Sequence, residues 1–446
     1  MKLIHIPFCF YPDPVGGTEI YVAALAHQQQ RSGDEVIVAA PGDEDQTYKH
    51  DGLTVRRFSV SPRVSHLREM YGDGSPDAAA SFARILDQER PDLVHLHAFT
   101  RAVSLRLLRE AKQREIPVVF SYLTPTASCL RGTLLRWGSE VCDGLLDTHR
   151  CARCVLHGQG LAKPASVMLG SLSPKTGAFL GGLGASGGLW TALRMTELVA
   201  LRQAAFRGLM NEADHIVALC DWVKDLLLRN GAPAAKLSVS RLGLCQAPTA
   251  APRQERVAAS GLRVAFLGRL DPTKGVHVLI EALRRIPTAA IQLDVYGVAQ
   301  GDSGRSYGNR LAQLAGGDSR IAFRAPVKSG EIVPLLHAYD VLAVPSQWLE
   351  TGPLVVMEAF AAGIPVIGSN LGGIAELVQH GVNGVLVDAA SAPDWAEALR
   401  RLSTSRDLIA ALRSGIKAPR TMVDTAADLM VIYRQLVPAH ASVFTS

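Results

Sequence analysis

Short apolar runs alternate with amphipathic helical patterns through the first half of the chain. Apolar residues recur at helical spacing at 81–88, 104–113 and 221–230. The other apolar runs have the length of strands, and they occupy residues 2–8, 35–40, 53–60, 92–99, 116–123, 215–220 and 236–242. Strands that alternate with helices typically form a parallel sheet covered on both faces, so this half is predicted to be a doubly wound, Rossmann-like α/β domain.

A second alternating series begins near residue 261. Its helical patterns lie at 276–286 and from Pro353 onward, and its apolar runs lie at 262–268, 291–297, 320–325, 340–346, 365–369 and 384–388. The segment before it is rich in Pro, Ala and charge, which favours a linker between domains. We therefore predict a first domain over 1–246, a linker over 247–260, a second Rossmann-like domain over 261–420, and a segment over 421–446 whose helix crosses back to the first domain.

The composition narrows the class of protein. The chain has 446 residues, 48% hydrophobic and 20% charged, which is typical of a globular protein with enough apolar material for two cores. Its formal net charge of +5 suits an anionic substrate or an anionic membrane surface, and it lacks the dense Lys/Arg blocks of a nucleic-acid binder. The amino end shows no secretory signal pattern, so we expect a cytoplasmic protein, with the inner face of a membrane as a further address.

Two carboxylates flank a predicted helix start near the middle of the second series. Glu350 and Glu358 lie on either side of an uncharged turn, and Pro353 in that turn suits the first turn of a helix. A helix amino end offers free N–H groups and a partial positive charge, so it readily binds an anion. A carboxylate beside that anion is better suited to accept hydrogen bonds from sugar hydroxyls. The pattern predicts a site for a phosphate group joined to a sugar.

Charged residues also follow the first strand of the second series, where open parallel sheets bind their ligands. Arg269 ends this strand and Lys274 precedes the next helix. A guanidinium, an ammonium and a helix amino end at one place suit a diphosphate. The alternative is that both residues are solvated loop charges.

The first domain has candidates at two strand ends. Gly16 and Gly17 follow the first strand, where paired glycines allow either a close backbone approach to a ligand or a tight turn, and Thr18 is the predicted N-cap of the next helix. His95 and His97 share one face of the fourth strand, and His97 is predicted to reach the cleft between the domains. A structural role is the common alternative for either histidine.

Taken together and in order, these motifs resemble family-4 retaining glycosyltransferases of the GT-B architecture over almost the whole chain. The motifs that carry the resemblance are GGTE (16–19), PDLVHLH (91–97), GRLDPTKG (268–275), the spacing of Glu350 and Glu358, EAFAAGIPVIGSNLGG (358–373) and GVNGVLVD (381–388). The resemblance implies two Rossmann-like domains that face each other across a cleft. It also implies a hexosyltransferase that needs no metal and moves a sugar, with retention of configuration, from a nucleotide-diphosphate sugar to a glycan or lipid-linked acceptor in polysaccharide or glycolipid assembly.

The resemblance also implies roles for individual residues. Arg269 and Lys274 are expected to hold the donor's diphosphate, Glu358 its ribose hydroxyls and Glu350 its sugar. The remaining expected donor contacts come from glycines and from the first helical turn, namely Gly16, Gly17, Gly352, Pro353, Leu354 and Val355, and His97 is expected to face the sugar or acceptor. Leu123 departs from the family, since many relatives carry a histidine there. Two other functions stay open: a sugar-nucleotide epimerase of the same architecture, and a non-catalytic sugar-nucleotide-binding scaffold or sensor.

Four cysteines form a second group within a predicted insertion at 124–190. Cys129, Cys142, Cys151 and Cys154 give the spacing C-x12-C-x8-C-x2-C. Four thiolates suffice for a closed tetrahedral zinc site or for an iron–sulfur cluster, and some relatives share a similar insertion. Free thiols are the alternative, because the spacing matches no standard zinc finger.

The end of the insertion overlaps an uncharged, glycine-rich segment, Thr176 to Leu193. Its length approaches that of a membrane span, but its glycines argue against a stable spanning helix. We predict an apolar loop beside the acceptor that touches a membrane, or else a glycine-rich surface linker.

Overall fold

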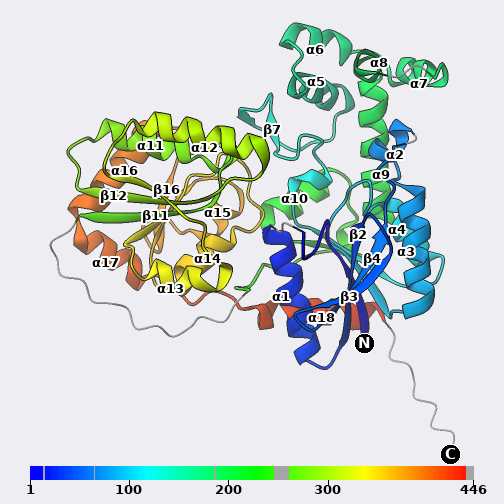
Figure 1. The fold of residues 1–446 in the computed structure, drawn as a ribbon, viewed down its shortest axis with the longest axis horizontal. Helices are drawn as coiled ribbons and strands as arrows, with labels where there is room; N and C mark the ends of the chain where they lie inside the picture. Colours follow the sequence, from blue (N-terminus) through cyan, green and yellow to red (C-terminus); the bar gives the residue numbers. More distant parts are fainter. Residues whose placement is uncertain (14–15, 65, 185–186, 246–260, 438–446) are drawn as a thin grey trace, which may run out of the picture. The chain divides into compact units, whose positions relative to one another are not determined.

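The computed structural model describes residues 1–13, 16–64, 66–184, 187–245 and 261–437 (Figure 1). The chain divides into two compact units, and each has its own sheet. Unit 1 comprises Met1–Arg241 together with Met422–Ser446, and unit 2 comprises Leu242–Thr421. The predicted linker at 247–260 lies outside the described residues.

Unit 1 contains an eight-stranded sheet in the order β10-β9-β6-β5-β1-β2-β4-β3. Its strands are β1 (Lys2–Ile6), β2 (Glu35–Gly42), β3 (Gln46–His50), β4 (Leu53–Ser59), β5 (Leu93–Leu96), β6 (Val118–Tyr122), β9 (His215–Ala218) and β10 (Leu237–Val239). The neighbours pair in parallel, except that β3 pairs antiparallel with β4 at the edge. Strand order reverses between β1 and β5, which makes their carboxyl ends a topological switch point where ligands of such sheets bind.

The helices of unit 1 cover this sheet and extend beyond it. They are α1 (Gly17–Arg31), α2 (Leu67–Tyr71), α3 (Pro76–Glu89), α4 (Leu105–Lys112), α5 (Thr148–Gly158), α6 (Lys163–Leu169), α7 (Pro174–Gly182), α8 (Gly188–Leu193), α9 (Met195–Glu212), α10 (Asp221–Arg229) and α18 (Met422–Leu436), with 3-10 turns η1 (Pro125–Ala127) and η2 (Ala234–Lys236). The N-cap of α1 is Gly16, because the Glu19 carboxylate accepts a hydrogen bond from the Gly16 N–H at 2.9 Å. The predicted N-cap, Thr18, is therefore wrong.

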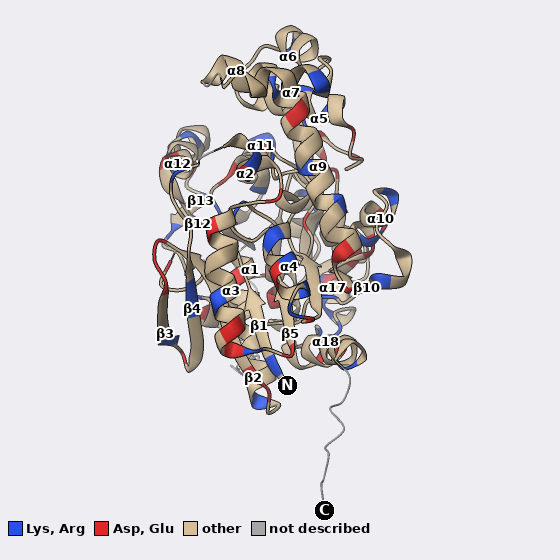
Figure 2. Ribbon diagram, turned by 90° about the vertical axis from the view of Figure 1, so that its right-hand side faces the viewer, with Lys and Arg blue, Asp and Glu red and all other residues tan. Residues whose placement is uncertain are grey.

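The segment between β6 and β9 carries most of the helices that lie outside the sheet layers. It forms a small hairpin, β7 (Leu135–Arg136) with β8 (Glu140–Val141), and then the helices α5 to α9. Figures 1 and 2 both show α5 to α8 gathered at one end of α9, away from the unit 1 sheet.

The apolar loop predicted at 176–193 is wrong for its described residues, because α7 and α8 occupy them. Ser173 caps α7 by accepting a hydrogen bond from the Lys175 N–H, and Pro174 fits its first turn. Gly177 allows α7 to pack closely on α9, since a Cβ there would lie 2.8 Å from the Glu197 Cβ. The glycines that suggested a loop thus include one that permits helix packing.

Unit 2 contains a fully parallel six-stranded sheet in the order β13-β12-β11-β14-β15-β16. The strands are β11 (Leu262–Arg269), β12 (Ile291–Val298), β13 (Ile321–Arg324), β14 (Val341–Val344), β15 (Val366–Ser369) and β16 (Gly384–Val387). The helical elements are η3 (Pro272–Lys274), α11 (Val276–Arg285), α12 (Gly301–Ala315), η4 (Ser329–Glu331), α13 (Ile332–Leu336), α14 (Leu354–Ala361), α15 (Gly372–Leu377), α16 (Ala392–Thr404) and α17 (Arg406–Ser414). Strand order reverses between β11 and β14, so unit 2 also has a switch point.

Two separate apolar cores show that helices cover both faces of the unit 2 sheet. One core joins the sheet to α11, α12, α16 and α17, with the fully buried Trp395 at its centre. The other joins it to α13, α14 and α15 through residues such as Leu336, Val356 and Ile374. The predicted fold class, two doubly wound Rossmann-like domains, is confirmed.

The last helix, α18, belongs to unit 1 and packs against α1. Tyr433 on α18 is fully buried, and its hydroxyl lies 2.5 Å from His95 Nδ1 on β5. Within the described part of the chain, no helix is both long and apolar enough to cross a membrane.

Candidate active site

The candidate donor residues of unit 2 follow the two strands at its switch point. Arg269 is the last residue of β11, and Lys274 ends the 3-10 turn η3 that follows. Glu350 lies in the loop between β14 and α14, and Glu358 lies within α14. Because β11 and β14 pair directly, these two loops leave the sheet side by side. The sheet thus brings together residues that lie about 80 positions apart in the sequence.

Close backbone packing holds the two loops against each other. The Gln347 N–H donates to the Thr273 carbonyl oxygen at 2.7 Å. Gly275 has φ +74°, and a Cβ at this position would lie 1.9 Å from the Pro345 carbonyl oxygen. Only glycine combines that backbone conformation with such a close approach. This contact fixes the position of Lys274 relative to the loop after β14.

Lys274 and Glu350 form an ion pair, with Nζ 2.6 Å from Oε1. The same oxygen accepts hydrogen bonds from Ser346 Oγ and Trp348 Nε1, each at 2.8 Å. Glu350 is 8% exposed, and burial opposes its ionisation. The Lys274 charge and the three hydrogen bonds outweigh burial, so the pKa of Glu350 lies below its ordinary value. Glu350 therefore stays ionised and holds the Lys274 ammonium at the switch point.

Gly372 and Gly373 pack against the backbone of the loop that carries Glu350. The Gly373 N–H donates to the Glu350 carbonyl oxygen at 2.7 Å. A Cβ on Gly372 or Gly373 would lie 2.9 Å or 2.8 Å from that oxygen. These glycines belong to the motif at 358–373, and the structure shows why that motif ends in a glycine pair.

The helix α14 begins one residue after the predicted start. Pro353 is its N-cap, and Leu354 and Val355 occupy its first turn. The first N–H groups of a helix have no acceptor inside it, so this end can donate to an anion. Gly352 precedes the cap in the same loop as Glu350. The structure thus places all four predicted backbone contacts at one helix amino end.

Glu358 differs sharply from Glu350 in its surroundings. Its Oε2 atom is buried and has no hydrogen-bond partner among the described residues. Burial raises the pKa of Glu358 from 4.5 to about 7. A buried acceptor without a donor costs free energy, and such costs are common where a ligand supplies the missing group.

Arg269 is exposed and makes no side-chain hydrogen bond or ion pair with the described part of the chain. The other two arginines within the strands of this sheet, Arg263 and Arg324, both pair with Asp294. Arg269 is thus a cation at the end of β11 whose guanidinium is available to an anion.

Gly16, Gly17 and His97 lie at the switch point of unit 1. Gly16 and Gly17 begin α1 after β1, and His97 follows β5. His97 is only 2% exposed, and its Nε2 lies 2.8 Å from His5 Nδ1. Its Nδ1 is buried without a hydrogen-bond partner among the described residues. Contact between these residues and a substrate stays a prediction.

Three histidines of unit 1 come close enough to share a metal ion. One ring nitrogen each of His5, His95 and His97 lies within 4.8 Å of the other two. Both nitrogens of His5 and of His95 already have partners, which are His97 and Gln29 for His5, and Tyr433 and Ser121 for His95. Burial lowers the pKa of His5 to about 4 and those of His95 and His97 well below the ordinary value. We interpret the group as a neutral hydrogen-bonded network that joins β1, β5, β6 and α18.

The four predicted metal ligands of the insertion, Cys129, Cys142, Cys151 and Cys154, line a single cavity. All four are free thiols. No three of their sulfur atoms lie within 4.8 Å of one another, since the histidine group alone meets that criterion within the described ranges. The structure therefore does not confirm a metal cluster, and the assignment stays a prediction.

The sequence interpretation missed the residues that hold the site together. Ser346 and Trp348 bind Glu350, and Gly275 sets the distance between the two loops. Gly275 lies inside the motif GRLDPTKG, so the need for a tight turn there is the signal that could have pointed to it. Ser346 and Trp348 carry no such signal, because their role depends on a loop conformation that the sequence does not reveal.

Comparison with known proteins agrees with this arrangement. Residues 16–243 match the family described as glycosyl transferase 4-like domain, and residues 250–418 match the family glycosyl transferases group 1. A D-inositol 3-phosphate glycosyltransferase of Rhodococcus jostii is 33% identical over 260 residues, covering 53% of this chain and 55% of the relative. The same enzyme of Corynebacterium aurimucosum is 40% identical over 145 residues, covering 31% of this chain and 34% of the relative. The chain thus matches about half the length, or less, of these curated relatives.

Solved structures share the fold over nearly the entire chain. Sucrose-phosphate synthase from Thermosynechococcus elongatus superposes with a TM-score of 0.66 at 18% identity, covering 98% of each chain. HepE of Anabaena in complex with UDP and glucose superposes with a TM-score of 0.63 at 19% identity, covering 98% of this chain and 100% of that one. One assignment follows from the two family matches, the two sheet domains, and the cations at the switch point of unit 2. The chain is a glycosyltransferase of the GT-B type, and it belongs to the family with a glycosyl transferase 4-like domain followed by a group 1 domain.

Proposed function

We propose that this glycosyltransferase moves a hexose, with retention of configuration, from a nucleotide-diphosphate sugar to a lipid-linked glycan. The observation that carries the donor assignment is Glu358 in the short helix α14, whose buried Oε2 atom has no hydrogen-bond partner among the described residues. A pair of vicinal hydroxyls fits the two oxygens of a carboxylate and can supply the donor that Oε2 lacks here. The ribose of a nucleotide offers such a pair.

The remaining parts of the proposed donor site match the donor's diphosphate. Arg269 offers a guanidinium that has no side-chain partner in the described part of the chain, and Lys274 offers an ammonium that Glu350 holds in place. The amino end of α14 adds N–H groups from a third direction. HepE of Anabaena has also been solved with UDP-glucose, which makes UDP-sugars the first donors to test.

In the proposed reaction the bond between the anomeric carbon and the diphosphate oxygen breaks as negative charge develops on the leaving group. Fixed cations and a helix amino end stabilise that charge more strongly in the transition state than in the bound donor. The acceptor hydroxyl forms the new bond on the same face of the sugar, and its proton passes to the departing diphosphate. Glu350 holds the Lys274 ammonium in place through their ion pair, and it is proposed to lie beside the donor sugar. Gly16, Gly17 and His97 are proposed to border the donor and acceptor from the switch point of unit 1.

A donor panel tests this proposal. Purified protein is incubated with UDP-, GDP- and ADP-hexoses, and free sugar and nucleoside diphosphate are measured together with thermal shifts. We expect slow release of both products from one donor, and a loss of about 100-fold or more in Arg269→Ala, because one charge-stabilising contact typically carries that much. Arg400→Ala, an exposed arginine of the same unit, is the control. A changed sugar without release would indicate an epimerase, and binding without turnover would indicate a sensor, so either outcome contradicts the proposal.

The lipid-linked acceptor is proposed from the surface of α6, α7 and α8. Large apolar side chains are exposed there, namely Val167, Met168, Phe179, Leu183 and Leu189. Phe179 and Leu189 are each 70% exposed. No Asp or Glu occurs from Thr148 to Thr196, whereas Arg150, Arg153, Lys163, Lys175 and Arg194 fall within this segment (Figure 2). Apolar side chains among basic ones suit the interface of an anionic membrane.

Flotation with liposomes tests the membrane contact. The wild type is expected to float with vesicles of phosphatidylcholine and phosphatidylglycerol and not with phosphatidylcholine alone. Replacing Phe179 and Leu183 by serine is expected to abolish flotation, whereas Val431→Ser, an equally exposed apolar position on α18, leaves it unchanged. Equal flotation of the two variants would refute the surface assignment. Transfer to a water-soluble acceptor such as D-inositol 3-phosphate, at a rate unaffected by vesicles, would refute the lipid-linked acceptor and leave the donor assignment intact.

A further inference from the structure

The four cysteines of the insertion come from three different elements that meet at one cavity. Cys129 follows η1, Cys142 follows the hairpin strand β8, and Cys151 and Cys154 lie on α5. The cavity they line has a volume of ≈ 50 Å³. One water needs about 10–15 Å³ on such a measure, so this cavity has room for an ion rather than for a large cofactor.

The walls of the cavity combine apolar and basic side chains around the four cysteines. Most of the other lining groups are apolar, and they include Leu130, Leu134, Leu135, Leu145, Val155 and Val199. Four arginines also line it, namely Arg131, Arg136, Arg150 and Arg202. Arg131 and Arg136 would balance part of the negative charge that four thiolates around one divalent cation leave in excess, whereas Arg150 is already paired with Asp143.

Backbone amides already point at two of the sulfur atoms. The Gly144 N–H donates to Cys142 Sγ at 3.5 Å, and the Trp137 N–H donates to Cys154 Sγ at 3.3 Å. Donors to sulfur stabilise the thiolate, which is the form that binds metal. Hydrogen bonds of this kind orient the ligands of a metal site. Here one comes from the turn after Cys142, and the other comes from Trp137 in the hairpin.

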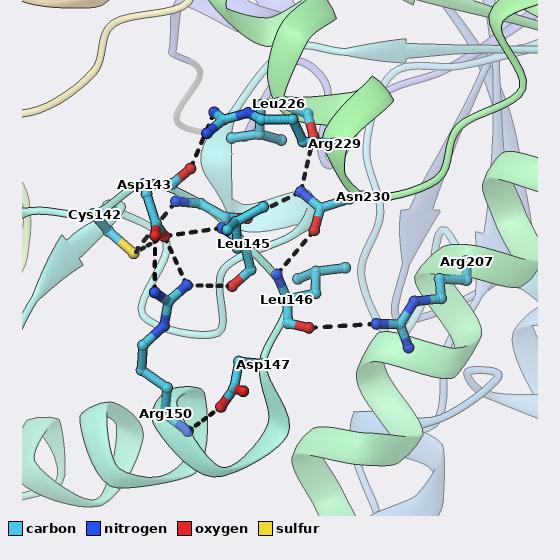
Figure 3. Close-up of polar contacts among 11 residues, drawn as sticks. Cys142, Asp143, Leu145, Leu146, Asp147, Arg150, Arg207, Leu226, Arg229 and Asn230 are labelled. Carbon is cyan, nitrogen blue, oxygen red and sulfur yellow. Dashed lines mark hydrogen bonds and ion pairs between the residues drawn. The ribbon is translucent and has the colours of Figure 1, made fainter.

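The loop between Cys142 and α5 is fixed by side chains from the neighbouring helices (Figure 3). Asn230, which ends α10, accepts from the Leu146 N–H at 2.8 Å and donates to the Gly144 carbonyl oxygen at 3.0 Å. Arg150 donates to both carboxylate oxygens of Asp143, at 2.6 and 2.8 Å. This loop of the insertion is thus held in a defined conformation that aims Cys142 toward the cavity.

The helix that carries the CxxC pair is fixed in the same way. Asp147 caps α5 by accepting from the Arg150 N–H at 2.6 Å. Cys151 and Cys154 are three positions apart on that helix, so they lie on one face. A tetrahedral zinc site places each sulfur about 2.3 Å from the metal, so binding requires the four sulfur atoms to come closer together than they lie here, where no three of them are within 4.8 Å of one another.

We propose that Cys129, Cys142, Cys151 and Cys154 bind one zinc ion as a structural tetrathiolate site. The ion cross-links the end of β6, the hairpin β7–β8 and the helix α5. It thereby ties the α5 to α8 helices to the sheet of unit 1. This inference is independent of the donor and acceptor proposed above, because it concerns a site that the transfer reaction does not use.

Metal analysis of the full chain, purified without chelator, tests the proposal. We expect about one zinc per chain in the wild type and in a variant with Cys9, Cys220 and Cys245 all changed to serine, which keeps the four proposed ligands. Cys142→Ser and Cys154→Ser are expected to lose most of the zinc. Less than half an equivalent of zinc in the wild type, or iron with the visible absorption of an iron–sulfur cluster, would overturn the assignment.

A second measurement does not depend on whether the variants fold. Native wild-type protein is alkylated with and without a zinc chelator, and the modified cysteines are located by mass spectrometry. Cys129, Cys142, Cys151 and Cys154 are expected to be protected until the chelator is added, while Cys9 reacts equally in both conditions. Equal labelling of the four cysteines with and without chelator would overturn the proposal.

Discussion

Ionisation of Glu358 is expected to destabilise the folded protein, so a neutral side chain at this position should raise the free energy of unfolding at neutral pH. Burial raises the pKa of this carboxyl from 4.5 to about 7. Below pH 4.5 the side chain is protonated in both the folded and the unfolded chain, so it costs nothing. Between that pH and about 7 the unfolded chain releases the proton while the folded one retains it, and the folded state is progressively destabilised. At about 1.4 kcal/mol for each pH unit, the cost reaches at most about 3 kcal/mol above pH 7.

The test variant is Glu358→Gln, which keeps the size of the side chain and removes its ionisation. The free energy of unfolding is measured by urea denaturation across the pH range, and the variant is compared with the wild type. We expect the difference between them to shift in favour of the variant by about 2–3 kcal/mol from roughly pH 5 to pH 8, whatever the fixed cost of the amide. Glu397→Gln, an exposed acid on α16, should show no shift of that size.

Donor binding should change in the opposite direction. The ionised carboxylate accepts the donor's hydroxyls, so the wild type is expected to lose affinity as pH falls below about 7, by up to tenfold for each pH unit. Glu358→Gln should bind the donor about 10- to 100-fold more weakly at pH 8, since hydrogen bonds to charged groups contribute roughly 1.5–3 kcal/mol. Isothermal titration calorimetry with the nucleoside diphosphate measures both. A stability difference independent of pH, or an unchanged affinity in the variant, would refute the reasoning.

Two further substitutions separate positioning from direct contact in the same site. Lys274→Ala should reduce transfer by about 100-fold or more, and it should also lower the free energy of unfolding by a few kcal/mol, because it leaves Glu350 buried without its cation. Arg269→Ala should reduce transfer alone, because Arg269 has no ion-pair partner among the described residues. Equal melting temperatures of the two variants would contradict this. Gly275→Ala should destabilise unit 2 by more than 1 kcal/mol, because φ is +74° and the new Cβ would meet the Pro345 carbonyl oxygen; a melting temperature equal to that of the wild type would show that the turn can relax.

The alternation of strands and helices was predictable because the parallel strands are buried on both faces. The apolar runs at 262–268 and 291–297 correspond to β11 and β12 within one or two residues. The polar edge strand β3 gave no such signal, since its residues at 46–50 are partly or fully exposed. Glycines in α7 and α8 lower the helix propensity of these segments, so the sequence pattern does not predict the two helices. Packing against α9 stabilises α7 in the fold.

The candidate site was predictable as a set of residue types and not as a set of partners. Arg269, Lys274 and Glu358 were placed at strand ends and in a helix, and the structure has them there. That Lys274 pairs with Glu350 could not be read from the sequence, because the contact joins residues 76 positions apart. It depends on the adjacency of β11 and β14 and on the close approach at Gly275.

The two glutamates of the motif now have separate physical roles. Glu350 has its cation and its donors within the protein, so its charge is permanent and its energy is balanced before any ligand arrives. Glu358 has no donor for Oε2 among the residues that the structure describes and a pKa near neutrality, so hydroxyls supplied by a ligand would stabilise its charge. Two carboxylates in one motif whose environments move their pKa values in opposite directions usually do different work. Here one arranges the protein's own cation, and the other is left unsatisfied in a way that favours the ligand.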